Sequence, residues 1–462
     1  MPQATRRWIS EKVKSLHKAD LLPFHEILDA QMVDTALASA GVTFKERIYT
    51  PFVTLCMFLS QVLDPDHSCR AAVARLIVWL TVNDRKPCSP DTNSYCDARQ
   101  RLPLGVIVAL VLLTARKVEA DARDQWLWKG RKVALVDGST ISMPDTVKNQ
   151  QEFPQSNTQK PGLGFPVARL VAIISLATGV VRDLALGPYK GKETGETALF
   201  RTLMEGLEAG QVVLGDRYFA SYFTLAALIK RDVDGLFRMH QRRKFDFRRG
   251  RRLGSEDHVV TWAKPPRPDW MDKDTYDQVP MELRVRELRF KVQQPGFRVN
   301  ELVLVTTMLE SEEYTKEELA HLFIERWNIE LDLRSIKDVL QMDVLRCKTP
   351  EMVKKEIWMH LLAYNLIRGV MAKAAEAHDK QPRHLSFKGT LQTMAAFQVD
   401  LRRARPRCRK RLVEAMLKAI SEHQVGDRFG RVEPRANKRR PKAQRFLMEP
   451  RKQARKRLLT AA

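Results

Sequence analysis

Short runs of β-branched and aliphatic residues alternate with helical segments between residues 130 and 240. The runs with the length and composition of strands are Lys132–Val136, Val167–Leu176, Gly179–Leu186, Val212–Leu214 and Gly235–Met239. A turn sequence separates the second run from the third, so these two are predicted to form a hairpin. Glu196–Leu207 and Tyr222–Ile229 have helical spacing. The resulting order, β-β-β-α-β-α-β, restricts this part of the chain to an α/β fold with a mixed sheet and flanking helices.

The residues before about 125 are predicted to be helical, because apolar segments such as Phe52–Leu63 have helical spacing. Ser89 and Pro90 are typical of a helix N-cap followed by proline at the first helical position. The helix after them would carry Arg99 and Arg101. A helix, a short break and a basic helix are compatible with a DNA-reading helix-turn-helix. A plain helical bundle with solvated arginines fits the same residues equally well.

The segment from about 240 to 300 interrupts the α/β pattern. It is rich in charge and proline and alternates in stretches such as Leu283–Phe290, so it is predicted to be a mostly β insertion. Glu301–Thr307 then returns to an apolar strand, and Lys316–Leu340 and Met352–Ala374 are predicted helices. We therefore expect an N-terminal helical domain (1–125), an α/β domain in two pieces (126–239 and 301–375), a β-rich insertion (240–300) and a basic C-terminal region (376–462).

The charge of the chain is strongly positive and unevenly distributed. The net charge is +24, and residues 401–462 hold 21 Lys and Arg against 5 Asp and Glu. An excess of positive charge of this size favours binding to a polyanion, above all nucleic acid. The C-terminal region combines arginine runs with Pro406, Pro434 and Pro441, so we expect it to be part helix and part flexible basic arm.

Secretion and membrane insertion are disfavoured by the sequence. Met1–Lys14 is charged with no apolar stretch behind it, so no secretory signal is predicted. Apolar runs such as Gly105–Ala115 are shorter than the ~20 residues that span a bilayer. The 6 cysteines include no C-x-x-C pair, which argues against a zinc site and suits a reduced, cytosolic protein.

Two aspartates share one sequence context, the end of a short buried strand. Asp137 follows a run that begins at Val133, and Asp216 follows a run that begins at Val212. If these strands are neighbours, both carboxylates lie at one edge of the sheet, and oxygen ligands of this kind suit Mg²⁺. The alternative is structural, because Asp-Gly is a common turn dipeptide and either aspartate alone fits a turn as well as a site.

A third acidic residue lies among basic residues on a predicted helix. On a regular helix, Phe323, Arg326, Glu330 and Lys337 fall within about 60° of one another, beside a separate apolar stripe. A carboxylate flanked by two cations suits a metal bound beside a phosphodiester. Glu330 would ligate the metal, and Arg326 and Lys337 would hold phosphates. A surface helix with ordinary ion pairs at these spacings is the alternative.

The same four residues match the pattern Y-x2-R-x3-E-x6-K, with Phe323 in place of tyrosine. In this pattern the chain resembles the insertion sequence 4 family of bacterial DDE transposases. Other blocks that agree with that family are Asp137–Thr140 with Pro144 and Asp145, Gly164–Leu170, Asp216–Tyr222 and Leu302–Thr307. The resemblance covers roughly residues 50–370 and implies a ribonuclease H-like catalytic domain, the fold that the strand order also resembles.

Two departures from the family pattern concern contacts with DNA. Phe323 lacks the hydroxyl that a tyrosine would offer to a phosphate, which weakens one expected contact. Relatives that cut through a DNA hairpin are expected to stack a flipped base on a tryptophan of the insertion. Leu302 stands near the aligned position, and Trp262 and Trp270 are the candidates that remain. A hairpin intermediate is therefore not established by the sequence.

The resemblance implies that Asp137, Asp216 and Glu330 bind two Mg²⁺ ions, with Mn²⁺ as an alternative, and catalyse cleavage at transposon ends and transfer of the 3′-hydroxyl into target DNA. The residues expected to contact DNA or phosphate are Arg326, Lys337, Arg217, Phe323, Trp327, Arg99 and Arg101. The resemblance also implies that the N-terminal domain binds terminal inverted repeats, that a homodimer forms the synaptic complex, and that the protein acts in the bacterial cytoplasm at the nucleoid.

Three other functions remain open at this stage. A metal-dependent nuclease of the same fold would cleave DNA without joining it. A non-catalytic DNA-binding protein derived from a transposase would have lost an acidic residue, whereas all three are present. A basic RNA-associated protein is disfavoured, because no aromatic and basic signature of a common RNA-binding module occurs.

Overall fold

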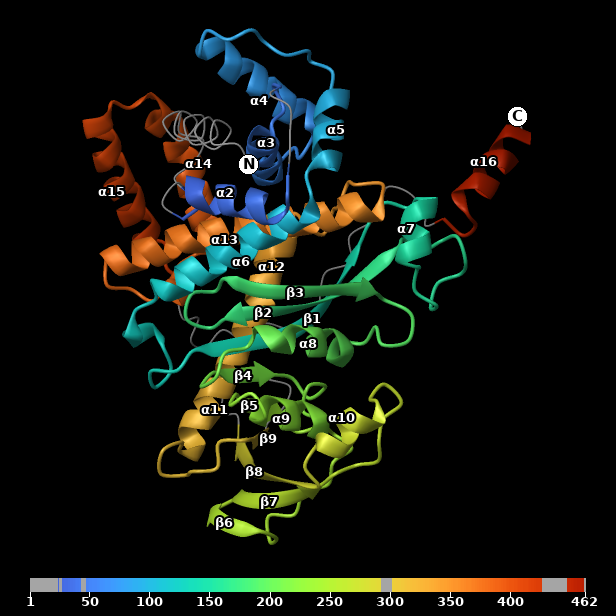
Figure 1. Cartoon of the computed structure of the whole chain (residues 1–462), viewed down its shortest axis with the longest axis vertical. Helices are drawn as coiled ribbons and strands as arrows, with labels where there is room; N and C mark the ends of the chain where they lie inside the picture. Colours follow the sequence, from blue (N-terminus) through green and yellow to red (C-terminus); the bar gives the residue numbers. More distant parts are fainter. Residues whose placement is uncertain (1–23, 25–26, 43–46, 292–300, 426–446, 461–462) are drawn as a thin grey trace. The chain divides into compact units, whose positions relative to one another are not determined.

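The computed structural model describes residues 24, 27–42, 47–291, 301–425 and 447–460 (Figure 1). The predictions for Met1–Lys14, Pro434 and Pro441 lie outside these residues. The chain divides into two compact units. The first unit contains residues 1–130, 174–183 and 331–425, and the second contains residues 131–173, 184–330 and 426–462. The two units are described separately below.

A nine-stranded mixed sheet has the order β3-β2-β1-β4-β5-β9-β8-β7-β6 (Figure 1). Its strands are β1 (Val133–Ser142), β2 (Val167–Ser175), β3 (Val181–Pro188), β4 (Val212–Gly215), β5 (Asp234–Arg238), β6 (Arg251–Gly254), β7 (Asp257–Ala263), β8 (Glu282–Lys291) and β9 (Glu301–Thr306). The β1–β4 and β4–β5 pairs are parallel, and β5–β9, β8–β9, β7–β8 and β6–β7 are antiparallel. The predicted fold class is confirmed, and the order of the first five strands is that of a ribonuclease H-like sheet.

In the second unit, helices accompany this sheet. They are α7 (Val147–Glu152), α8 (Glu196–Leu203), α9 (Tyr222–Ile229), α10 (Lys273–Gln278), α11 (Lys316–Ile324) and α16 (Arg451–Thr460). The apolar sides of α8 and α9 pack with β1, β4 and β5 in one core, in which Val136, Val213 and Phe237 are fully buried. This burial explains why the strands are continuous apolar runs, as in sheets covered on both faces.

Trp262 belongs to that core. Its side chain is 4% exposed, and its indole N–H donates to Glu287 Oε1 at 2.8 Å. The guanidinium of Arg243 lies 3.5 Å from the centre of its ring. Trp262 is therefore not available to stack on a flipped base, and that candidate is wrong. Trp270 is exposed, with Arg201 at 3.6 Å from its ring centre.

Strand β1 and the helix after β9 differ from their predicted forms. Instead of ending before Asp137, β1 continues to Ser142, because Ser139, Thr140 and Ile141 extend the β conformation beyond the aspartate–glycine pair. The predicted helix Lys316–Leu340 is not continuous. It consists of α11, a 3₁₀ turn (Glu325–Trp327), α12 (Asn328–Arg334) and a π turn (Ser335–Val339).

The first unit is largely helical, as predicted for the residues before 125. Its helices are α2 (Ala30–Ser39), α3 (Pro51–Leu63), α4 (Cys69–Val82), α5 (Asn93–Arg101), α6 (Leu104–Ala120), α13 (Pro350–Ala377), α14 (Phe387–Arg403) and α15 (Pro406–Glu422). The long helix α13 is buried along most of its length, and its Asn365 side chain bonds the backbone N–H and carbonyl of Val181 at 2.8 and 2.9 Å. Among the described helices, none combines the length and apolar character needed to cross a membrane.

The pair α4 and α5 does not form the tight unit expected of a helix-turn-helix. Residues 83–92 separate the two helices, a longer connection than the three- or four-residue turn of that motif. Arg99 is buried and lies over the rings of Phe58 and Tyr95, at 5.0 and 5.2 Å from their centres. The prediction that Arg99 contacts DNA is therefore wrong in this conformation, whereas Arg101 is exposed at the end of α5.

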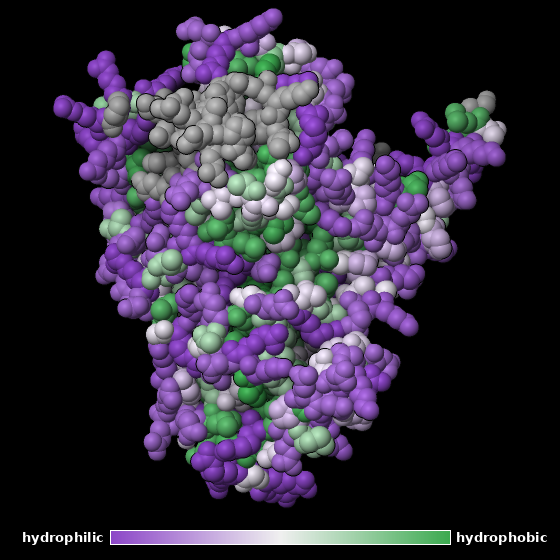
Figure 2. All heavy atoms as spheres, in the orientation of Figure 1, coloured by the Kyte–Doolittle hydropathy of each residue, from purple (hydrophilic) through white to green (hydrophobic). Residues whose placement is uncertain are grey.

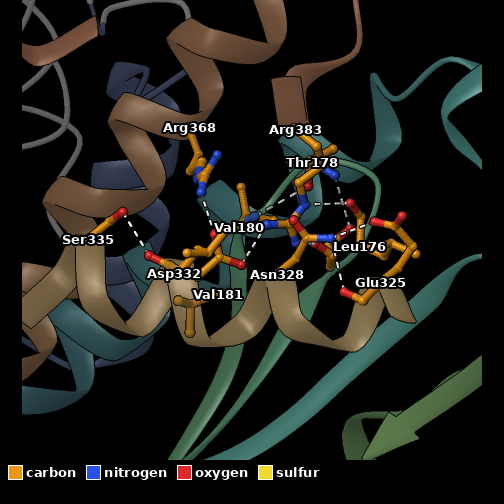
Figure 3. Close-up of polar contacts among 12 residues, drawn as sticks. Leu176, Thr178, Val180, Val181, Glu325, Asn328, Asp332, Ser335, Arg368 and Arg383 are labelled. Atoms are coloured by element: carbon orange, nitrogen blue, oxygen red, sulfur yellow. Dashed lines mark hydrogen bonds and ion pairs between the residues drawn. The ribbon is translucent and has the colours of Figure 1, made fainter. Parts of the chain in front are cut away.

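A buried ionic cluster forms around Asp332 within the first unit (Figure 3). Asp332 accepts a hydrogen bond from the Tyr364 hydroxyl at 2.9 Å and pairs with Arg383 at 2.6 Å and with Arg368. Arg383 also donates to the carbonyl oxygen of Leu176 at 2.6 Å. Two arginines thus satisfy one fully buried carboxylate, as a buried charge requires.

Candidate active site

The sheet register places the two predicted aspartates side by side. Leu135 of β1 pairs with Leu214 of β4, which pairs with Leu236 of β5. Two positions further along, Asp137 and Asp216 therefore follow in the same row. Because side chains alternate between faces with a period of two, both aspartates project from the same face. The carboxylates are thus brought together by strand pairing, as the sequence predicted.

Asp137 lies in the middle of β1, where the strand changes from buried to half-buried residues. The backbone N–H of Gly138 donates to its Oδ1 at 2.8 Å, and Arg326 Nη1 lies 3.7 Å from its Oδ2. Burial raises the pKa of Asp137 to about 6; the N–H of Gly138 and Arg326 lower it, and the charges of Asp216 and Glu330 raise it. Asp137 therefore carries incompletely neutralised negative charge.

Asp216 follows directly after the last residue of β4. Its Oδ1 accepts the backbone N–H of Tyr218 at 2.8 Å, so the aspartate closes a local turn and is held by it. The structure thus confirms a turn at Asp216, and the role of Asp216 as a metal ligand stays a prediction. The neighbouring Arg217 donates from Nη1 to Gln241 Oε1 at 2.6 Å.

Arg326 links two of the three predicted acidic residues. Its Nη2 lies 3.2 Å from Glu330 Oε1, and its Nη1 is the group near Asp137. Arg326 is mostly buried, whereas the Glu330 side chain is 44% exposed. This ion pair is the one that the structural alternative predicted from the i,i+4 spacing, and it persists across the change from the 3₁₀ turn to α12.

The other residues expected on this helix stripe are placed differently. Phe323 is 4% exposed, so no surface for a DNA contact remains on it, although the Arg326 guanidinium lies 6.0 Å from its ring centre. Trp327 is partly exposed, with Arg326 at 5.1 Å from its ring centre. Lys337 lies in the π turn, so the regular helical spacing that aligned it with Glu330 does not hold.

This geometry can be compared with known proteins. The family model described as "Transposase DDE domain" matches residues 128–366 of the chain, more than half of its length. The chain belongs to the transposase DDE domain family. The matched residues contain Asp137, Asp216 and Glu330.

Two insertion-sequence transposases that are similar in sequence agree with this assignment. The transposase InsG for insertion sequence element IS4 of Escherichia coli is 28% identical over 428 residues, which cover 90% of this chain and 91% of InsG. The transposase for insertion sequence element IS421 of Escherichia coli is 41% identical over 69 residues, 15% of this chain and 19% of that protein. The piggyBac transposase synaptic complex with hairpin DNA aligns with a TM-score of 0.43 and 9% identity over 86% of this chain and 84% of that one.

Two residues of this DDE domain site had no signal in the sequence. Glu196, the first residue of α8, places its carboxyl group against Gly138, where any Cβ atom would overlap it. Burial raises the pKa of Glu196, and the charge of Asp216 raises it further. Arg238, at the end of β5, extends the row of Asp137 and Asp216, because Gly215 pairs with Phe237. Only strand pairing and packing bring these two residues to the site.

The three acidic residues have the chemistry to hold a divalent cation, since all their ligand atoms are carboxylate oxygens. In the described part of the chain, however, no group of three His, Cys, Asp or Glu side chains is gathered closely enough to hold a metal ion. Arg326 instead contributes the positive charge between Asp137 and Glu330. The charges of Asp216 and Glu330 raise the pKa of Asp137, so the three carboxylates repel one another, and a bound cation would offset this repulsion.

Proposed function

We propose that this DDE family transposase cuts DNA at the ends of an insertion sequence and transfers the resulting 3′-hydroxyl into target DNA, by a cut-and-paste route. The observation that carries the proposal is the row of Asp137 and Asp216 on one face of the sheet, with Arg326 between Asp137 and Glu330. These carboxylates come from parts of the chain that are distant in sequence: Asp137 from β1, Asp216 from the residue after β4, and Glu330 from α12.

In this proposal Asp137, Asp216 and Glu330 hold two Mg²⁺ ions, with Mn²⁺ as an alternative. Bound metal would supply Lewis acidity, which favours hydroxide formation and stabilises the leaving oxygen. The protein's own groups orient the ligands: the Gly138 N–H fixes Asp137, and the turn at Tyr218 fixes Asp216. Arg326, which is already charged and mostly buried, would bind a phosphate oxygen of the scissile strand.

The remaining parts of the chain are proposed to serve DNA binding and assembly. The N-terminal helices, including the exposed Arg101, would bind the terminal inverted repeats. The basic C-terminal region would add phosphate contacts or dimer contacts, because residues 401–462 carry most of the excess positive charge. Synapsis of two ends implies a homodimer on DNA, acting in the bacterial cytoplasm at the nucleoid. The four-domain division at 1–125, 126–239 with 301–375, 240–300 and 376–462 remains a prediction.

A cleavage and strand-transfer assay tests the proposal. Purified wild-type protein is incubated with Mg²⁺ and a labelled duplex from the end of its own element, and then with target DNA. We expect cleavage and joined products from the wild type and neither from Asp216→Ala, while binding to the end duplex is retained. Cleavage by Asp216→Ala in Mg²⁺ would contradict the mechanism.

The two DNA-directed alternatives give different results in the same assay. A nuclease of this fold would cleave the duplex and join nothing. A non-catalytic DNA-binding protein would bind the duplex and leave it intact, also in Mn²⁺. The presence of all three acidic residues in the matched family region favours an active enzyme over the second alternative.

A further inference from the structure

Arg238 is a cation at the candidate site that forms no hydrogen bond or ion pair with the residues that the structure describes. It ends β5 in the row of Asp137 and Asp216, and its side chain is half-buried. Among the described residues, none forms a hydrogen bond or an ion pair with its guanidinium. Burial lowers the pKa of Arg238, and the charges of Arg217 and Arg326 lower it further, while Asp216 opposes them. A half-buried cation beside two like charges and one carboxylate is stabilised further when a phosphate joins it.

A second group of cations begins close to Arg217. We call residues 242–252 the basic segment; it contains seven arginines and lysines and a single acidic residue, Asp246. Arg248 and Arg249 already pair with Asp246, at 2.9 and 3.5 Å. Phe245, between the cations, is 38% exposed. Figure 2 shows that hydrophilic residues predominate on the visible surface over β6 and β7, the strands next to this segment.

Three exposed cations of the basic segment have no partner in the described part of the chain. The side chains of Arg242, Lys244 and Arg251 form no hydrogen bond or ion pair with any other residue that the structure describes, and all three are exposed. A protein that only needs solubility gains little from so dense a run of one sign, since like charges repel. The pattern of exposed cations around an exposed aromatic ring is that of a surface for a nucleic-acid backbone.

The basic segment is anchored to the core of the insertion. The carbonyl oxygen of Arg249 bonds His258 Nδ1 at 2.7 Å, and His258 Nε2 bonds Glu287 at 3.1 Å. Arg243 stacks on the buried ring of Trp262. Gly250 has a φ of +76°, and a Cβ there would meet the carbonyl of Val259, so the turn needs glycine. The cations are therefore presented on a fixed backbone, which lowers the entropic cost of binding.

Arg217 connects the two groups. Its hydrogen bond to Gln241 joins the loop after Asp216 to the residue that precedes the basic segment. Cations thus follow one another from Arg326 and Arg238 at the carboxylates, through Arg217, to the basic segment. The phosphates of a DNA strand are similarly continuous, so one strand could contact all of these residues in turn.

We propose that Arg238 binds a phosphate at or next to the cleaved bond and that the basic segment binds the backbone of the same double-stranded DNA beyond it. The inference rests on the proposed function for the position of the cleaved bond. The DNA contact itself is a separate property, and it can be measured without any cleavage.

The salt dependence of DNA binding tests the basic segment. Binding of full-length protein to an end duplex is measured in EDTA over a range of salt concentrations, for wild type and for Arg242→Gln/Lys244→Gln/Arg251→Gln. The matched control is Lys230→Gln/Lys273→Gln/Arg284→Gln, which removes three exposed cations from the same unit. We expect the slope of log K against log salt to fall by about 2–3 in the first variant, since each lost contact contributes about 0.9, and to change little in the control. Equal changes in both variants, or none in the first, would overturn the proposal.

A phosphate-removal experiment tests Arg238. The affinities of wild type, Arg238→Gln and Arg238→Lys are measured for duplexes with and without an uncharged methylphosphonate at the cleaved position. We expect the methylphosphonate to weaken duplex binding by wild type and by Arg238→Lys severalfold. Binding by Arg238→Gln should weaken much less, because the glutamine variant has already lost the contact. An equal loss in all three proteins overturns the role of Arg238. A wild type that binds in this way but never cleaves would refute the proposed function and leave the DNA contact established.

Discussion

The molecule contains two clusters of arginine and carboxylate groups with opposite balances of charge. Around Asp332, two arginines and a tyrosine hydroxyl satisfy one fully buried carboxylate. Around Asp137, Arg326 forms ion pairs with two carboxylates, Asp216 adds a third negative charge, and Arg238 lies beside Asp216 in the strand row. A cluster that is complete without a ligand is typical of a structural role, whereas a cluster with excess negative charge is typical of a site that awaits a cation.

The largest expected effect is on catalysis at the incomplete cluster. Asp137→Asn should lower single-turnover cleavage by a thousandfold or more, which corresponds to about 4 kcal/mol. The free energy of unfolding should stay the same or rise slightly, because one of several repelling charges is removed. A cleavage rate within tenfold of the wild-type rate would contradict a catalytic role for the cluster around Asp137. Thermal unfolding of the same preparation serves as the control for folding.

The complete cluster should respond in stability instead. Asp332→Ala should lower the free energy of unfolding by about 3–5 kcal/mol, because Arg368 and Arg383 would remain buried without an anion. Asp338→Ala is the matched control, since its pair with Arg334 is exposed and contributes less than about 0.5 kcal/mol. Urea unfolding measures both variants. Similar effects of the two substitutions would show that burial does not distinguish these carboxylates.

The core next to the complete cluster should also be sensitive to acid. Burial lowers the pKa of His360, on the same helix as Arg368, to about 4. The unfolded chain takes up the proton first as the pH falls, so this contribution to stability is complete above about pH 6.5 and is lost between about pH 6.5 and 4. The loss should reach up to about 3 kcal/mol. In His360→Gln the free energy of unfolding should depend less steeply on pH over this range. An unchanged pH dependence would contradict the lowered pKa of His360.

The smallest expected effects concern two arginines of α5, the exposed Arg101 and the buried Arg99. Arg101→Gln should weaken binding to the end duplex by one phosphate contact, lowering the salt slope by about 0.9, without a measurable change in stability. Arg99→Gln should destabilise by about 1–3 kcal/mol, because the buried guanidinium packs on Phe58 and Tyr95. Fluorescence anisotropy and thermal unfolding separate the two outcomes. Loss of binding only in Arg99→Gln would reverse the assignment of these arginines.

Local patterns predicted the parts of the site that depend on local structure. The strand runs before Asp137 and Asp216 and the i,i+4 spacing of Arg326 and Glu330 are properties of a few consecutive residues. Family blocks added the order of the three acidic residues along the chain. The same sources predicted the α/β class and the helical character of the residues before 125.

The remaining features depend on contacts between distant residues. Arg238 joins the aspartates only through the pairing of β4 with β5, and Glu196 only through the packing of α8. The 3₁₀ and π turns that interrupt the helix around Glu330 have no clear sequence signature, so the regular spacing assumed for Lys337 does not apply, and its phosphate contact stays a prediction. Arg99 was predicted to contact DNA at the surface because it is charged, but its guanidinium is buried against other side chains.

The close approach of Glu196 to Gly138 has a consequence for how mutations at this position act. Gly138 has no unusual backbone conformation, so an alanine there would leave β1 intact. The new methyl group would instead displace the flexible end of Glu196. A substitution at Gly138 would thus move the negative charge of Glu196 away from Asp216, although Glu196 itself is unchanged. In a mutational survey, position 138 would therefore behave as a remote substitution of Glu196.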